Sequence, residues 1–191
     1  LHDALPISLR QINSRLQGHP CVHKTPGVEL STGPLGLGLG AGVGMALGER
    51  LKKSNAYIYV VLGDGESEEG GVWEAAMAAS KFKTTHCIAF LDSNGVQLDG
   101  TLEEIMPMGD IAAKWEAFGW NVIRCDGHDV SAIEAAVREA KEETKKPTII
   151  ICATVKGKGI SFMEGKSAWH GKPIGDKEYE QAKLELGGNA S

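Results

Sequence analysis

The sequence has no apolar run long enough to span a membrane. A spanning helix needs roughly 20 apolar residues in succession, and no stretch of the 191 residues approaches this. The first residues also lack a basic region followed by an apolar one, the pattern of a secretory signal. We therefore expect no membrane partner.

Basic residues are in deficit. The chain has 20 Lys and Arg against 25 Asp and Glu, a net charge of −5 at pH 7. Because charge-driven binding to nucleic acids or anionic membranes requires an excess of positive charge, we expect neither partner. With 42% apolar and 24% charged residues, the composition is that of an ordinary globular protein with room for one well-packed domain.

Cysteine is scarce and scattered. The four thiols are Cys21, Cys87, Cys125 and Cys152, and no two of them form a C-x-x-C pair. The last three fall inside apolar runs, which is typical of buried free thiols rather than metal ligands or disulfides. This usage predicts a reducing, cytoplasmic setting.

Glycine, in contrast, is abundant, with 25 residues. Between residues 35 and 52 it recurs at Gly36, Gly40, Gly44 and Gly48, a spacing that places these positions along one helical stripe. We expect a helix whose glycine face packs closely against another backbone or a ligand. A dinucleotide-binding loop is the alternative, but no strand precedes the segment and its spacing fits G-x-G-x-x-G only with one substitution.

Apolar, β-forming runs alternate with helical segments along the chain. The expected strands are residues 56–62, 86–91, 121–125 and 147–155. Residues 130–146 between the last two strands are strongly amphipathic, with apolar residues at helical spacing. The alternation predicts an α/β fold that is doubly wound, with a mainly parallel sheet and helices on both faces.

The chain is expected to form a single domain over residues 9–191. Residues 1–8 fit none of the pattern and are interpreted as a foreign or junction segment. Residues 9–16 are expected to form one or two turns of amphipathic helix. Thr101 and Glu104 have the spacing of a capping box at a helix start.

Polar residues follow the first two expected strands. Asp64 lies between Gly63 and Gly65 after the first, and Asn94 and Val96 follow the second. Parallel strands bring their carboxyl ends to one edge of a sheet, where open α/β sheets bind ligands. A carboxylate, an amide oxygen and a backbone carbonyl suit Mg²⁺, which takes further oxygens from water and phosphates. A magnesium–diphosphate site is predicted; the alternative is that Asp64 caps a helix and Asn94 occupies a turn.

Four motifs in order resemble the transketolase family. Gly63-Asp64-Gly65 with Asp92-Ser93-Asn94-Gly95 resembles the thiamine diphosphate signature. The motifs more specific to transketolase are Gly18-His19-Pro20, Thr32-Gly33-Pro34-Leu35-Gly36 and Trp169-His170-Gly171. The signature alone leaves pyruvate dehydrogenases and acetolactate synthases open, and deoxyxylulose-phosphate synthase is a nearer alternative. The resemblance extends from Leu9 essentially to the end of the chain.

The resemblance implies thiamine diphosphate and Mg²⁺ as cofactors. Asp64, Asn94 and the carbonyl of Val96 would hold the metal ion, and the N–H of Gly65 would contact the diphosphate. By the same resemblance, the cofactor-binding residues are Gly33, Pro34, Leu35, Gly65, Asn94 and His170.

His19 and His170 resemble the family histidines that face the reacting carbon, and they are the expected catalytic residues. Neutral imidazole can both give and accept a proton near pH 7. Glu69 resembles the acid that links paired active sites across a subunit interface. The implied reaction is ketol transfer, in which the bond between carbons 2 and 3 of a ketose phosphate breaks and the two-carbon unit passes to an aldose phosphate.

Two parts of the family pattern are absent from this sequence: an upstream Gly-His segment, and the pyrimidine-binding domain that carries an activating glutamate. The resemblance therefore implies an N-terminally truncated N-terminal subunit of a split transketolase. Its partner would be a C-terminal subunit carrying the pyrimidine domain, in a dimer of heterodimers that acts on sugar phosphates. The alternative is a cofactor-binding or assembly module without activity of its own.

Overall fold

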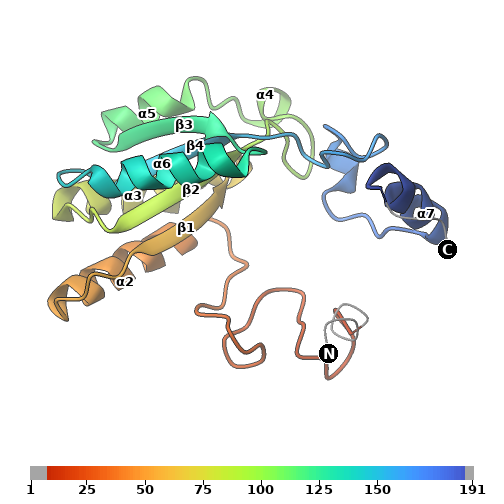
Figure 1. Cartoon of the computed structure of the whole chain (residues 1–191), viewed down its shortest axis with the longest axis horizontal. Coiled ribbons are helices and arrows are strands. Elements are labelled where there is room, and N and C mark those ends of the chain that lie inside the picture. Colours follow the sequence, from red (N-terminus) through yellow and green to blue (C-terminus); the bar gives the residue numbers. More distant parts are fainter. Residues whose placement is uncertain (1–7, 188–191) are drawn as a thin grey trace.

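The computed structural model describes residues 8–187. In this part of the chain, four parallel strands form one sheet in the order β1-β2-β4-β3, with helices on both faces (Figure 1). The predicted doubly wound, parallel α/β fold is confirmed. Residues 1–7, most of the expected junction segment, lie outside the described residues.

The strands lie close to the predicted apolar runs. They are β1 (Ile58–Gly63), β2 (Cys87–Ser93), β3 (Asn121–Asp126) and β4 (Thr148–Ala153). Because every pair is parallel, the carboxyl ends of all four lie at one edge of the sheet, on the right in Figure 1. In the register, Gly63 of β1 lies beside Asp92 of β2, so the segments that follow these strands begin next to each other.

The helices connect and cover the strands. The α-helices are α2 (Gly38–Leu51), α3 (Gly70–Phe82), α4 (Leu102–Ile105), α5 (Ile111–Ala117), α6 (Val130–Glu142) and α7 (Asp176–Glu185); η1 (Gly65–Glu68) and η2 (Ser167–Trp169) are short 3₁₀ helices. The predicted capping box of Thr101 and Glu104 is confirmed at the start of α4. The helix expected over residues 9–16 is wrong: Arg10 and Asn13 have positive φ angles, which a right-handed helix does not allow.

Two hydrophobic cores lie on opposite faces of the sheet. On one face, Leu62 and Ile149 pack with apolar residues of α2, α3 and α5; on the other, Ile150 and Ile123 pack with α6. The neighbours Ile149 and Ile150 belong to different cores because successive side chains of a strand point to opposite faces. Burial on both faces explains why β4 is almost continuously apolar.

The glycines of α2 pack differently from the prediction. A Cβ at Gly42 would lie 2.4 Å from Cγ2 of Val60, whereas nothing in the described part of the chain lies within 4 Å of one at Gly44 or Gly48. Helix α2 therefore approaches β1 through Gly42. The expected contact along every fourth glycine is wrong at Gly44 and Gly48, whereas a Cβ at Gly36 or Gly40 would lie 2.8 Å from Glu69 or 3.9 Å from Ala75. The reason is orientation: the buried face of α2 consists of Leu39, Gly42, Val43 and Ala46.

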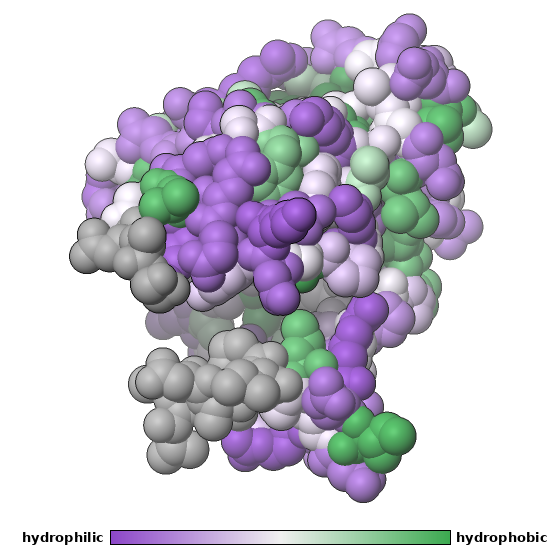
Figure 2. Space-filling model, turned by 90° about the vertical axis from the view of Figure 1, so that its right-hand side faces the viewer, coloured by the Kyte–Doolittle hydropathy of each residue, from purple (hydrophilic) through white to green (hydrophobic). Residues whose placement is uncertain are grey.

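Two irregular segments extend from the sheet on the side of its carboxyl edge (Figure 1). Residues 8–37 lead into α2, and residues 154–175 connect β4 with α7. Figure 2 views the molecule from this side, where hydrophilic residues dominate and apolar ones are interspersed. Glu185 of α7 holds the second segment, accepting hydrogen bonds from the N–H and hydroxyl of Ser161 at 2.6 and 2.7 Å. Within the described range, no helix has the length and apolar character to cross a bilayer.

Candidate functional site

Asp64 joins the end of β1 to the turn after β2. Its Oδ1 accepts a hydrogen bond from the N–H of Gly65 at 2.8 Å, and its Oδ2 accepts one from the N–H of Gly95 at 2.6 Å. The residue is only 5% exposed. This burial raises the pKa of Asp64 above the ordinary aspartate value, while the N–H donors act in the opposite direction. A bound cation would stabilise the ionised carboxylate at such a position.

Asn94 shapes the turn that follows β2. Its Oδ1 accepts a hydrogen bond from the N–H of Val96 at 3.0 Å, and its Nδ2 donates to Oδ2 of Asp92 at 3.2 Å. The turn is closed by backbone hydrogen bonds to the carbonyls of Gly95 and Gly100. The backbone of Val96 is thereby fixed beside Asp64 at the carboxyl edge.

One cavity of about 550 Å³ gathers six of the nine predicted site residues. They are Leu35, Asp64, Gly65, Asn94, Val96 and His170. His170 reaches it from the end of η2, where its N–H donates to the carbonyl of Ser167 at 2.8 Å. The cavity thus draws its lining from positions that are far apart in the sequence.

Gly33 and Pro34 line an adjoining cavity of about 460 Å³. Leu35 and Glu66 line both cavities and so mark the boundary between them. His19 lies against Gly33: a Cβ at Gly33 would come within 2.7 Å of its imidazole Cγ, and the φ of +143° there also favours glycine. The structure therefore brings His19 to the glycine segment, but His19 is not part of the larger cavity's lining.

Glu66 is a structural residue of the site that the sequence did not reveal. Its Oε1 accepts a hydrogen bond from the N–H of Gly36 at 2.9 Å, and its Oε2 accepts one from the N–H of Gly63 at 3.2 Å. Glu66 thereby ties the segment before α2 to the end of β1. In the sequence it was only one of several acids at a helix start, and no local pattern indicates a partner 30 residues away.

The larger cavity is strongly acidic. Its basic lining residues are Lys156 and His170, whereas its carboxyl groups are those of Asp64, Glu66, Glu68, Glu69, Asp92 and Asp99. Oε1 of Glu68 is buried and accepts no hydrogen bond within the described residues. A buried carboxylate oxygen without a donor is unfavourable, and a cation would relieve this.

The residues present fit a metal-bound diphosphate. Residues 8–187 contain no group of three or more His, Cys, Asp or Glu side chains arranged to hold a metal ion, but the expected ligands here are a carboxylate, an amide and a carbonyl. Hard oxygen ligands of this kind, completed by water and phosphate, suit Mg²⁺. A Cβ at Gly65 would lie 2.8 Å from Cβ of Gln97, so packing against Gln97 requires glycine at this position. The N–H of Gly65 already donates to Asp64, so a diphosphate would have to share it.

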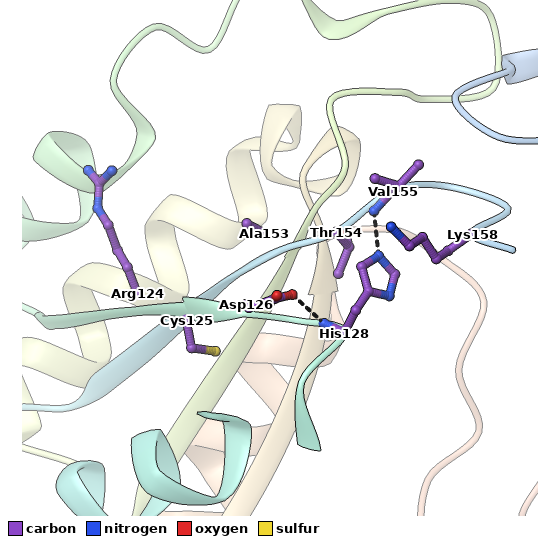
Figure 3. Close-up of a pocket in the computed structure, with 8 residues that line it drawn as sticks. All are labelled: Arg124, Cys125, Asp126, His128, Ala153, Thr154, Val155 and Lys158. Carbon is purple, nitrogen blue, oxygen red and sulfur yellow. Dashed lines mark hydrogen bonds between the residues drawn. The ribbon is translucent and has the colours of Figure 1, made fainter. Parts of the chain in front are cut away.

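A separate cleft of about 540 Å³ lies at the ends of β3 and β4, away from Asp64 (Figure 3). Its cations do not converge, because Arg124 is directed away from His128 and Lys158 and pairs with Asp110 at 3.6 Å. The Nε2 of His128 accepts a hydrogen bond from the N–H of Val155 at 2.8 Å. The cleft thus lacks the convergent donors of the cavity around Asp64.

Residues 6–191 match the family model described as transketolase, thiamine diphosphate binding domain. The chain belongs to this family. The match confirms the resemblance and identifies thiamine diphosphate as the cofactor that the family binds.

Curated relatives of this transketolase-family chain include proteins named as transketolase subunits. It is 42% identical over 179 residues to the 6-deoxy-6-sulfo-D-fructose transketolase subunit SqwG of Clostridium sp. (strain MSTE9), covering 94% of this chain and 65% of the relative. It is 44% identical to an apulose-4-phosphate transketolase subunit of Actinobacillus succinogenes, covering 96% and 66%. Transketolase 1 of Escherichia coli is 39% identical, covering 94% and 29%. The chain thus spans about two thirds of the length of the two subunits.

Solved transketolase structures have the same fold over nearly the whole chain. Transketolase from Campylobacter jejuni superposes with a TM-score of 0.90 at 32% identity, covering 96% of this chain and 30% of that one. A Pichia stipitis transketolase complex with sedoheptulose-7-phosphate gives a TM-score of 0.89 at 35% identity, covering 96% and 29%.

Proposed function

We propose that this chain is the cofactor-holding part of a transketolase N-terminal subunit. The assembled enzyme transfers a two-carbon ketol unit from a ketose phosphate to an aldose phosphate, using thiamine diphosphate and Mg²⁺. The observation that carries the proposal is the meeting of Asp64, Asn94 and Val96 around one acidic cavity in a transketolase-family chain.

In this proposal, Asp64, Asn94 and the carbonyl of Val96 hold Mg²⁺. Support comes from the buried carboxylate of Asp64 and from the turn that Asn94 fixes beside it. The remaining ligands come from water and from the diphosphate, as is usual for Mg²⁺ at phosphate sites.

Glycine and apolar positions bind and orient the cofactor. Gly65 contacts the diphosphate through its backbone, while Gly33, Pro34 and Leu35 line the cofactor rings; the adjoining cavities support this arrangement. Bound thiamine diphosphate supplies the electron sink for cleaving and forming the carbon–carbon bond.

His170 and His19 handle protons and substrate. A ring nitrogen of His170 accepts and returns the proton of a substrate hydroxyl, which its place in the cavity lining supports. His19 acts on the substrate from beside the glycine segment, which its position against Gly33 supports. Glu69, an exposed acid at the cavity, faces the paired active site of a second subunit.

The partner in this proposal is a C-terminal subunit that carries the pyrimidine domain, and the assembly is a dimer of heterodimers. Two relatives named as transketolase subunits support the need for a partner. Residues 9–191 form one domain of the complex, which works in the cytoplasm on sugar phosphates of the pentose phosphate pathway or related sugars.

Reconstitution tests this function. The chain is mixed with the companion subunit of a split transketolase, Mg²⁺ and thiamine diphosphate, and ketol transfer from xylulose 5-phosphate to an aldose phosphate is followed. We expect turnover that requires both chains and that is lost in Asp64→Ala. Absence of turnover in the complete mixture would contradict the enzyme function, and full activity of Asp64→Ala would contradict the site.

A further inference from the structure

Two cysteines face each other across strands β3 and β4. Cys125 and Cys152 are partners in the register of the parallel sheet, and their Sγ atoms lie 3.7 Å apart. Both side chains belong to the hydrophobic core that packs with α6, so they point to the same face of the sheet. Each is the last residue but one of its strand. The two thiols are therefore in contact at the carboxyl edge of the sheet.

The backbone at this pair has the spacing of a disulfide bond. Neighbouring strands lie roughly 4.8 Å apart, and disulfide-bonded cysteines have Cα atoms roughly 4.4–6.8 Å apart. Because Cys125 and Cys152 are in register on neighbouring strands, their separation falls in this range. Closing a bond between them requires rotation of the side chains and no rearrangement of the sheet.

The surroundings of the pair favour redox chemistry over metal binding. Within residues 8–187, no three His, Cys, Asp or Glu side chains are arranged to hold a metal ion. In the same range the pair forms the one thiol–thiol contact, since Cys21 and Cys87 are free thiols elsewhere in the fold. Two thiols without a third ligand are better suited to form a disulfide than a metal site.

The two thiols differ in their access to solvent. Cys125 is partly exposed and lines the cleft at the ends of β3 and β4 (Figure 3), whereas Cys152 is 7% exposed. Burial, together with the adjoining Cys125 thiol, raises the pKa of Cys152 to about 12. An oxidant from solution therefore meets Cys125 first. Cys152 is rarely ionised, but its thiolate is a strong nucleophile, and its contact with Cys125 favours reaction between the two.

We propose that Cys125 and Cys152 are a redox-active pair that closes to a disulfide bond when the folded protein meets a small disulfide oxidant. The thiolate of Cys125 attacks one sulfur of the oxidant, which breaks the S–S bond of the oxidant, releases one thiol and leaves a mixed disulfide on Cys125. Cys152 then loses its proton, and its sulfur attacks Sγ of Cys125 and displaces the second thiol. The protein thiols lose two electrons and two protons in total, and the two sulfurs of the oxidant take them up.

The test incubates folded Cys21→Ser protein with excess glutathione disulfide. This background removes a partly exposed thiol that would otherwise link two molecules. Trypsin cuts after Arg124 and Lys145, so the two cysteines fall in separate peptides, 125–138 and 146–156. Mass spectrometry should find these peptides joined in most molecules and separated again by dithiothreitol, while Cys87 remains a free thiol.

Thermal unfolding, measured after removal of the oxidant, shows whether the folded sheet accommodates the bond. The midpoint should rise by about 5 °C in the oxidised protein, because the crosslink between β3 and β4 restricts the unfolded chain. Cys125→Ser in the same background is the matched variant, since it removes one thiol at the partly exposed position. Circular dichroism verifies its fold, and it should show neither joined peptides nor a rise in midpoint.

Three results would overturn the inference. In the first, glutathione stays on Cys125 while Cys152 remains a free thiol. In the second, the two peptides become joined only when the oxidant is added in urea. In the third, the oxidised protein unfolds at an unchanged or lower midpoint. None of these measurements involves thiamine diphosphate or Mg²⁺, so their outcome is independent of the proposed function.

Discussion

Single carboxylates connect separate segments of the chain at the site. Asp64 joins β1 to the turn after β2, and Glu66 joins β1 to the segment before α2. Hydrogen bonds from backbone N–H groups to charged acceptors contribute more than neutral ones. These two side chains therefore hold together the segments that line the cavity.

Glu66→Ala should lower the free energy of unfolding, because the N–H groups of Gly36 and Gly63 lose their acceptor. With Glu66 partly buried, we expect a loss of about 1–2 kcal/mol. Urea denaturation followed by tryptophan fluorescence measures it. Glu74→Ala, at an exposed position of α3, is the control and should change stability little. Equal stability of the two variants would show that Glu66 does not hold the site together.

The buried thiols should be unreactive in the folded protein. Burial raises the pKa of Cys87 to about 12, and burial together with the nearby Cys125 thiol raises the pKa of Cys152 to about 12. Since the thiolate is the nucleophile, roughly one molecule in ten thousand is reactive at about pH 8. Mass spectrometry after iodoacetamide treatment should find Cys21 alkylated, and Cys87 and Cys152 alkylated only in urea. Labelling of Cys87 at the rate of Cys21 would contradict this.

At the same scale, the sequence predicted Asp64 and Asn94 because each directly follows an apolar strand. The sequence could not predict that Glu66 contacts Gly36 or that Lys156 lines the cavity. The partner of Glu66 is Gly36, in a distant segment, and Lys156 reaches the cavity only through the course of the loop after β4. Such contacts depend on tertiary packing, which no local pattern encodes.

At the scale of elements, the strands were predicted to within two residues at each end. Continuous apolar runs of this length have few alternatives in an α/β fold. The helix predicted over residues 9–16 was wrong, and the predicted glycine contacts were wrong at Gly44 and Gly48. Periodicity shows which positions share a face, but which face meets the sheet is decided by the packing of larger side chains, here Leu39, Val43 and Ala46.

The contact between α2 and β1 gives a paired prediction. Gly42→Ala places a methyl group against Val60 and should cost about 1–3 kcal/mol through overpacking. Gly44→Ala, two residues away in open space, should raise stability by up to about 1 kcal/mol because alanine favours the helix. Thermal unfolding of both variants measures the difference. Equal shifts would show that α2 does not approach the sheet through Gly42.

At the scale of the whole molecule, the parallel sheet is what assembles the site. All four strands end at one edge, and the segments before α2 and after β4 both reach it, so Leu35, Asp64 and His170 line one cavity. The family match and the two subunit relatives agree with a chain that supplies one part of a larger enzyme. In this account the chain contributes the metal and diphosphate end of the cofactor site.

The most direct test of that claim is calorimetric titration with thiamine diphosphate, in Mg²⁺ and in EDTA, of wild type, Asp64→Asn and Asp99→Asn. Asparagine preserves the size of Asp64 and can still accept from one of the N–H groups of Gly65 and Gly95, and circular dichroism verifies that the variant is folded. Asp99 is an exposed acid of the same cavity and serves as the control. We predict Mg²⁺-dependent binding by wild type and Asp99→Asn. In Asp64→Asn the affinity for thiamine diphosphate should fall by more than about tenfold, because loss of a group that merely orients a metal ligand already lowers metal affinity by about that factor. Binding that is independent of Mg²⁺, or unchanged in Asp64→Asn, would contradict the account.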